Sequence, residues 1–136
     1  MTLVAIILSM FTTVVSKTAD LTVSIEGLSQ TKGKMHIGVY NKSEGFREIE
    51  KTFANNILPV KANTVKCTFK SIPTGNYAIS VFQDLNSNGK MDKGLFGIPT
   101  EPYGFSSNPT ISFGPPSYED CKIILNTDRE IKIKLN

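Results

Sequence analysis

The strongest constraint on the fold is a two-residue alternation of apolar and polar side chains that recurs along the chain. Residues 21–26 and 35–40 show it clearly, with large aliphatic side chains at every second position. Successive side chains of a β-strand point to opposite faces, so this pattern predicts strands with one buried face. Residues 77–82 are apolar almost without interruption, which predicts a central strand buried on both faces. No long stretch has the period of a helix, and the pattern therefore predicts an all-β fold.

Seven predicted strands and the turns between them define the expected architecture. Together they favour one seven-stranded antiparallel β-sandwich over residues 20–136, of Ig-like or transthyretin-like type. Short polar turns at residues 62–64 and 126–129 predict two hairpins. One short helix is expected at residues 43–52, with Ser43 as its N-cap. The expected strands are residues 21–26, 35–40, 57–61, 65–72, 77–82, 121–125 and 131–135.

The first 19 residues are expected to form a secretory signal peptide. They begin with an uncharged apolar run that is shorter than the roughly 20 residues of a membrane span. Small and polar residues follow the run, as signal cleavage requires. Cleavage would leave residues 20–136 as one domain with no stable membrane span, in the periplasm or outside the cell. The alternatives are an uncleaved N-terminal anchor and a misassigned start of the sequence.

The charge of the chain argues against nucleic acid as a partner. Its 15 basic and 12 acidic residues give a net charge of +3, and no run of like charge occurs. The densest basic stretch, residues 130–135, alternates lysine with apolar residues. Such alternation is typical of the solvated face of a strand rather than of a nucleic-acid site.

Cys67 and Cys121 both fall on the apolar parity of their predicted strands, so both side chains are expected in the core. In an oxidising compartment an even number of cysteines permits one disulfide. The alternative is a pair of buried thiols that pack as small apolar side chains. The sequence favours neither alternative.

The most distinctive chemical feature is a turn at residues 84–92 that is expected to bind Ca²⁺. Oxygen-bearing side chains stand at alternate positions and Gly89 permits a sharp bend, so that oxygens can converge on one cation. An EF-hand is excluded, because Leu95 replaces its bidentate glutamate and no helix flanks the turn. The alternative is an Asn-Gly turn that Asx hydrogen bonds hold without metal. The expected ligands are Asp84, Asn86, Asn88, the Lys90 carbonyl, Asp92 and Glu101.

A proline-rich segment, residues 84–117, interrupts the rhythm of strands. It contains five of the 7 prolines, and a loop of this length in a compact domain is usually functional. Either the cation or packing of its aromatic residues is expected to hold the segment in shape. The aromatic residues are Phe96, Tyr103, Phe105 and Phe113; for the last three, packing is favoured over a role as a ligand platform.

Two linked motifs resemble a known family. The first is Phe69-x-x-Ile72-Pro73-x-Gly75-x-Tyr77-Ala78, which continues through the turn, and the second is Gly97-Ile98-Pro99-x-Glu101-x-Tyr103-Gly104-Phe105-Ser106. Over residues 20–136 the chain resembles the bacterial domain of unknown function DUF2141. The resemblance implies an exported bacterial protein, includes the expected ligands Asp84, Asn86, Asn88, Asp92 and Glu101, and names no substrate. The Pro73-x-Gly75-x-Tyr77 segment is also similar to the strand entry of transthyretin-like and carboxypeptidase-regulatory-like sandwiches.

The export signal, the turn and the long segment together predict an exported, non-enzymatic module. The module is expected to be stabilised by Ca²⁺ and to present the long segment to a protein, glycan or surface partner. A small-ligand carrier of transthyretin-like architecture is the first alternative. It would need an apolar pocket between the sheets or between subunits.

A hydrolase is the second and weaker alternative. His36 is the one histidine and lies on the polar parity of its strand, so it is expected at the surface, and it cannot build a multi-histidine zinc site. No Gly-x-Ser-x-Gly motif supports a serine hydrolase. A cleft that brought His36, Asp84, Asp92 or Glu101 within hydrogen-bond reach of one another would favour an enzyme.

Overall fold

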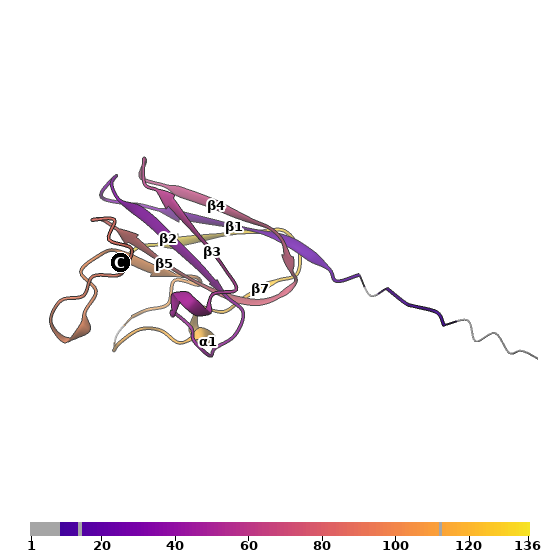
Figure 1. Ribbon diagram of the computed structural model, residues 1–136. Helices are drawn as coiled ribbons and strands as arrows, with labels where there is room; N and C mark the ends of the chain where they lie inside the picture. Colours follow the sequence, from indigo (N-terminus) through magenta and orange to yellow (C-terminus); the bar gives the residue numbers. More distant parts are fainter. Residues whose placement is uncertain (1–8, 14, 112) are drawn as a thin grey trace, which may run out of the picture.

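The computed structural model describes residues 9–13, 15–111 and 113–136, so the expected signal peptide lies partly outside the described residues. Within them the chain folds into two β-sheets (Figure 1). The smaller sheet has the order β4-β1-β8, with β1 Thr18–Glu26, β4 Val65–Pro73 and β8 Arg129–Lys134. The larger sheet has the order β3-β2-β5-β6, with β2 Lys34–Tyr40, β3 Ala54–Pro59, β5 Gly75–Asp84 and β6 Tyr103–Phe105. β7, Ile123–Leu125, pairs with the start of β5.

The core between the sheets is built from the alternating positions that the sequence marks. One face of β1 and one face of β2 supply side chains that are completely buried. Burial of each such side chain stabilises the fold by about 1.5–3 kcal/mol relative to exposure. The fully buried residues of these two strands are Leu21, Val23, Ile25, Met35, Ile37 and Val39. The all-β, two-sheet architecture predicted from the alternation is confirmed.

The strand count and the strand directions differ from the prediction. The described residues form eight strands rather than seven, because β6 is a three-residue strand inside the proline-rich segment. Its pattern is too short to show an alternation. β1 and β8 pair in parallel, so the sandwich is not purely antiparallel. The two strands are the first and the last of the chain, and their pairing depends on contacts that no local pattern encodes.

Both predicted hairpins are wrong. The turn at residues 62–64 joins β3 to β4, and the turn at residues 126–129 joins β7 to β8. In each case the two strands belong to different sheets, so the turn carries the chain across the sandwich. A short polar turn has the same composition in either geometry, and only the sheet partners distinguish the two.

The helix expected at residues 43–52 is also wrong. Only the 3₁₀ turn η1, Ile49–Lys51, forms there, because Gly45 and Arg47 have φ angles of 73° and 76° that break a helix. A short helix lies elsewhere, at α1, Tyr118–Cys121. Ser117 and Asp120 cap it reciprocally, each accepting the main-chain N–H of the other.

β5 is an interior strand, as its continuous apolar sequence predicts. It pairs with β2 on one side and with β6 and β7 on the other. Its second face lies under a smaller cluster on the outside of the larger sheet, into which α1 and the segment after β2 pack. The buried members of this outer cluster are Tyr40, Ala78, Phe105, Tyr118 and Cys121.

Both cysteines are buried free thiols. Cys67 packs between the sheets, whereas Cys121 ends α1 and belongs to the outer cluster. The expected burial of both side chains is therefore correct, and the structure corresponds to the alternative without a disulfide.

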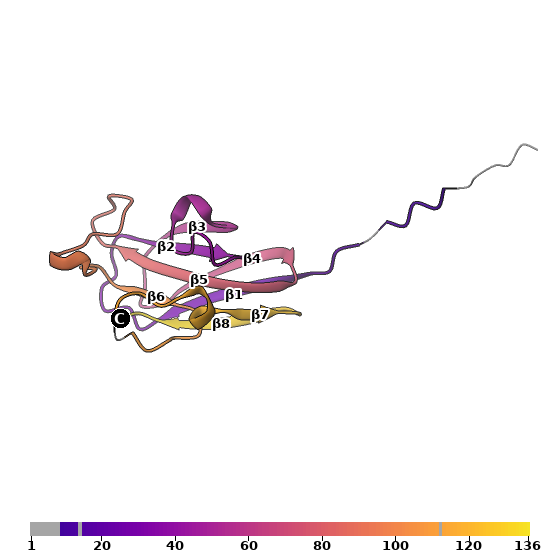
Figure 2. The same ribbon diagram turned by 90° about the horizontal axis from the view of Figure 1, so that it is seen from below.

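The end of β5 positions the part of the chain on which function is expected to depend. Residues 84–92, called the turn below, leave this strand, and residues 93–99, called the arm, follow. The arm projects beyond the sheets at the end of the molecule opposite to the N-terminal segment (Figures 1 and 2). None of the helices in the described part of the chain is long and apolar enough to cross a membrane.

Candidate functional site

Asp84 ends β5 and organises the turn from inside. Its side chain is 1% exposed, and a carboxylate buried to this degree needs hydrogen-bond donors. Oδ1 accepts the main-chain N–H of Asn88 at 3.1 Å, and Oδ2 accepts that of Gly89 at 2.8 Å. The residues after the strand are thereby folded back over its last side chain, which is why the chain bends at Gly89.

His36 supplies the third partner of Asp84. Its Nε2 lies 3.2 Å from Asp84 Oδ2, and its ring stacks on Phe82 with centroids 4.4 Å apart. The expectation that His36 is exposed is wrong, since the residue is 5% exposed. Strand parity places it on the outer face of the larger sheet, but at this end of β2 the outer face is covered.

The loop between β1 and β2 packs tightly against the end of β5, where the turn begins. Gln83 Nε2 donates to the carbonyl oxygens of Gln30 and Lys32, at 2.7 and 3.0 Å. Gly33 follows with a φ of 73°, and a Cβ at this position would lie 2.1 Å from the carbonyl oxygen of Asp84. Only glycine permits this approach of two backbones.

The polar side chains of the turn converge on Asp92. Asn86 Nδ2 donates to Asp92 Oδ2 at 2.5 Å, and Asn88 Nδ2 donates to Asp92 Oδ1 at 2.7 Å. The amide oxygens of the two asparagines accept main-chain N–H groups instead, those of Asn88 and Lys90. These are Asx hydrogen bonds, the arrangement that the metal-free alternative expects.

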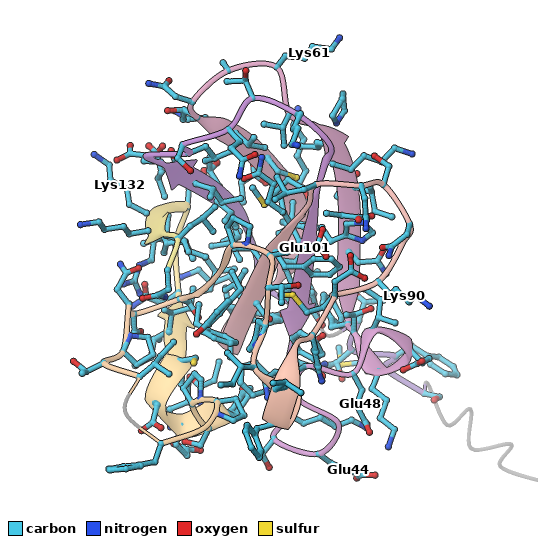
Figure 3. All side chains as sticks on the ribbon, turned by 90° about the vertical axis from the view of Figure 1, so that its left-hand side faces the viewer. Glu44, Glu48, Lys61, Lys90, Glu101 and Lys132 are labelled. Atoms are coloured by element: carbon cyan, nitrogen blue, oxygen red, sulfur yellow. The ribbon has the colours of Figure 1, made fainter. Side chains whose placement is uncertain are left out.

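Glu101 connects the two ends of the turn. Its Oε2 accepts the main-chain N–H of Leu85 at 2.6 Å, and its Oε1 accepts that of Asp92 at 2.9 Å. One carboxylate therefore joins the first and last parts of the turn, and it is 6% exposed. Figure 3 shows Glu101 within this end of the molecule, whereas Lys90 points outward. Glu101 reaches the turn, as the sequence predicts, but its contacts are main-chain N–H groups.

The geometry imposes a condition on calcium binding. Within the described ranges, no group of three or more His, Cys, Asp or Glu side chains is arranged to hold a metal. The amides of Asn86 and Asn88 present their nitrogens, not their oxygens, to Asp92. Ca²⁺ takes oxygen ligands, so both amides would have to turn over before an ion could enter.

The arm beyond the turn is a small, internally bonded loop. Lys93 and Pro99 form an isolated bridge at its base, and the 3₁₀ turn η2, Leu95–Gly97, forms its apex. The N–H of Gly94 donates to the carbonyl of Ile98 at 2.8 Å, which ties the two sides together. The arm is therefore a defined structure rather than an open connection.

The aromatic residues of the proline-rich segment divide into two groups. Phe105 is buried and Tyr103 packs beside it with ring centroids 6.0 Å apart, so the expected packing role is confirmed for both. Phe96 and Phe113 are 97% and 101% exposed, so the expectation that they pack is wrong. The sequence patterns do not predict the exposed apolar residues at the arm apex. The signal for them is the run Gly94-Leu95-Phe96-Gly97-Ile98-Pro99, in which apolar residues lie among helix and strand breakers.

The family comparison covers the turn, the arm and both sheets. A family model described as "Uncharacterized protein conserved in bacteria (DUF2141)" matches residues 23–134. The chain belongs to the DUF2141 family. The resemblance of the sequence motifs is therefore confirmed over most of the chain. Neither the curated proteins nor the solved structures contain a match to this DUF2141 protein.

Two surface hollows lie away from the turn and the arm. One of about 380 Å³ is lined by residues between β2 and β3, including Lys42, Glu50 and Phe53. The other, of about 320 Å³, lies where β1 and β8 end, beside Glu26 and Lys132. Neither hollow lies between the sheets, which is one of the two places, with the contact between subunits, where the carrier alternative expects its apolar pocket.

Proposed function

We propose that this DUF2141 protein is an exported, non-enzymatic binding module that uses the arm to engage a protein, glycan or surface partner. One observation carries the proposal: Leu95, Phe96 and Ile98 are 83%, 97% and 62% exposed at the apex of an arm whose base is fixed. Exposed apolar groups that gather in one place mark interaction sites, whereas single ones are ordinary.

The fixed base supports this proposal. Glu101 joins Leu85 to Asp92, and Thr100 N–H donates to the Asp92 carbonyl at 2.9 Å just below the arm. An apex that is already ordered loses less conformational entropy when it binds, so more of the contact free energy appears as affinity. The buried hydrogen bonds of the turn therefore contribute to binding affinity as well as to stability.

A hydrolase gains little support from the site. His36 and Asp84 are within hydrogen-bond reach, which is the juxtaposition that an enzyme would favour. Both side chains are buried, however, and the other partners of Asp84 are main-chain N–H groups of its own turn. We therefore assign the pair to holding the turn.

Calcium at the turn is a second part of the proposal. Its support is that the side chains of Asp84, Asn86, Asn88 and Asp92 already gather at one place, with a glycine at the bend. With the Lys90 carbonyl they would supply an oxygen-rich set once the amides have turned. Two carboxylates rather than four correspond to the weak end of calcium affinities, about 10⁻⁴ to 10⁻³ M. Such a site would fill only where calcium is abundant, as outside the cytosol.

We also propose that the sandwich is of the Ig-like or transthyretin-like kind. The Tyr77 hydroxyl donates to the carbonyl of Pro73 at 2.5 Å, four positions upstream. A tyrosine that closes a corner between two sheets in this manner is a feature of Ig-like sandwiches. The parallel pairing of β1 with β8 is a departure from the antiparallel pairing of such sandwiches.

The binding role of the arm can be tested by comparing a variant at its apex with a matched control. Purified native protein and the variant Phe96→Ser are each incubated with the envelope fraction of a bacterium that produces the protein. The envelope is then sedimented by centrifugation. The control is Phe113→Ser, an equally exposed phenylalanine outside the arm. Native protein and control should sediment with the envelope, and Phe96→Ser should stay in solution. The melting temperature of Phe96→Ser should equal that of native protein. Equal sedimentation of all three proteins would reject the arm as the binding element.

A further inference from the structure

Among the described residues that follow the expected signal peptide, the apex of the arm is the one place where three strongly exposed large apolar side chains lie together. Its three large side chains, Leu95, Phe96 and Ile98, lie within four positions of one another. The remaining exposed apolar residues of the sheets and turns occur at separate elements, such as Ile57 on β3 and Ile124 on β7. A single apolar side chain at the surface needs no explanation, but a group of three on a projecting loop does.

The backbone at the apex holds Phe96 outward. Its φ is 60° and its ψ is 23°, the left-handed region that a bulky residue rarely adopts. The flanking hydrogen bonds, from Gly94 to Ile98 and from Ile98 to Leu95, enforce this conformation. Unfavourable backbone conformations persist where the surrounding structure imposes them, and they cluster at functional sites. The result is a phenylalanine that is 97% exposed.

The charges that the turn and arm expose are of one prevailing sign. Lys90 and Lys93 are exposed, and Lys93 stands at the base of the arm beside Pro99. The carboxylates of Asp84 and Glu101 are buried against N–H groups. The fifth charged group, Asp92, is half-buried and is bonded to two asparagine amides. A partner that meets the arm therefore encounters apolar groups first and ammonium groups behind them.

We propose that the partner of the arm is the surface of an anionic lipid bilayer, into which the apex inserts. This inference rests on the proposed binding role and names the partner. From apex to base the arm presents aliphatic and aromatic side chains and then lysines, and a bilayer presents hydrocarbon beneath negatively charged headgroups. Interfacial protein segments insert apolar groups about 5–10 Å deep and contact anionic lipid through lysine or arginine.

The shape of the arm favours a lipid surface over a groove in a protein. The arm projects at the far end of the molecule, beyond both sheets (Figures 1 and 2), and its apex exposes three apolar residues. A fluid bilayer accommodates a small convex tip without a complementary pocket. A standard protein interface buries about 800 Å² on each partner, with a broad apolar centre and a polar rim. The three-residue tip offers little of such an area.

The protein contains no tryptophan, so one can be introduced as a reporter of insertion. In the variant Phe96→Trp, emission should shift to shorter wavelength and be quenched by brominated acyl chains when vesicles of phosphatidylcholine and phosphatidylglycerol are added. The matched control Phe113→Trp, equally exposed outside the arm, should show neither effect. Vesicles of phosphatidylcholine alone should bind at least about tenfold more weakly, because each lysine near an anionic surface contributes to binding.

Two further variants separate the apolar from the electrostatic contribution. Leu95→Ser should lower the partition of the protein onto anionic vesicles about tenfold, since one large apolar side chain no longer enters the bilayer. Lys93→Gln should lower it several-fold and reduce its dependence on salt. Both residues are exposed, so circular dichroism should be unchanged.

The outcomes distinguish this inference from the proposed function. An absence of tip-dependent binding to anionic vesicles would overturn the lipid as partner. If Phe96-dependent sedimentation with the bacterial envelope then persisted, the arm would remain a binding element whose partner is a protein or glycan. Loss of tip dependence in both experiments would reject both proposals.

Discussion

Glu101 Oε1 accepts the main-chain N–H of Asp92 at 2.9 Å, and this contact closes the turn from which the arm projects. The second oxygen of the same carboxylate accepts the N–H of Leu85 at 2.6 Å. A negatively charged acceptor makes stronger hydrogen bonds than a neutral one, about 1.5–3 kcal/mol each. One side chain thus supplies two of the hydrogen bonds that fix the base of the arm.

Replacement of Glu101 by alanine should release the base of the arm. With both main-chain donors unpaired, the turn should open locally, and trypsin should cleave after Lys90 and Lys93 at least about tenfold faster, because cleavage follows the population of the open form. Glu101→Gln keeps one acceptor oxygen and should give an intermediate rate. The control Glu119→Gln alters an exposed glutamate of α1 and should leave cleavage at these lysines unchanged. Equal rates in all variants would show that Glu101 does not hold the turn.

Calcium should raise the melting temperature of the native protein if the turn binds it. At ten times a Kd of about 10⁻³ M, the ion would stabilise the folded state by about 1.4 kcal/mol, or a few degrees. Asp84→Ala and Asp92→Ala should lose this gain, although Asp84→Ala also removes a buried hydrogen-bond hub and should melt lower in chelator. Magnesium, which requires a tighter octahedral geometry, should have a smaller effect. A native melting temperature that is equal in calcium and in chelator would leave the turn as an Asx network alone.

Gly33 and Gly27 provide a matched pair for testing the contact between the β1–β2 loop and the turn. Both have positive φ, 73° and 74°, so alanine is strained by about 1–2 kcal/mol at either position. A Cβ on Gly33 would also collide with the Asp84 carbonyl, whereas one on Gly27 meets nothing within 4 Å. In urea unfolding, Gly33→Ala should cost at least about 2 kcal/mol more than Gly27→Ala. Similar losses would mean that the turn is not packed against this loop.

The sequence predicts the faces of the strands better than it predicts their partners. The alternation identifies the buried positions of β1 and β2, because burial is a property of each strand. It does not reveal that β8 joins β1 in parallel or that two short turns cross between sheets, because those depend on partners distant in sequence. His36 illustrates the same limit. Its parity is correct, yet it is buried, since its ring stacks on Phe82 and contacts Asp84 at the start of the turn.

The candidate site could be located from the sequence, but its contacts could not be derived. Oxygen-bearing residues at alternate positions indicate where polar groups gather, and Glu101 does reach that place. A metal and a set of N–H groups satisfy carboxylates equally well, and spacing alone does not separate these alternatives. The exposure of the arm apex also cannot be predicted from the sequence, because a leucine or phenylalanine gives no indication of whether other residues cover it.

Both cysteines should react as free thiols once the chain is unfolded. In native protein at pH 8, a thiol reagent should react with neither, because both are buried. After unfolding in urea without reductant, it should react with both. Fewer than two reactive thiols in the unfolded chain would mean that a disulfide had formed. Since Cys67 and Cys121 lie in different clusters, such a bond would require the core to rearrange.

Stability should fall at alkaline pH because two buried acidic groups resist ionisation in the folded state. Burial, with a smaller contribution from the nearby Asp120, raises the pKa of the Cys121 thiol to about 12, and burial likewise raises the pKa of Tyr40 to about 12. Between the ordinary pKa of each group and this value, the unfolded chain has lost the proton and the folded chain retains it. The contribution of these two groups to the free energy of unfolding is therefore constant below about pH 8 and decreases above it, by up to about 1.4 kcal/mol per pH unit for each group. Urea unfolding at pH 8 to 11 should give a shallower decrease for Cys121→Ala than for native protein, and the remaining slope is due to the tyrosines whose pKa burial raises, Tyr40, Tyr77 and Tyr118. The cavity that this variant leaves costs the same at every pH, so only the slope is diagnostic, and identical slopes would show that the thiol does not contribute.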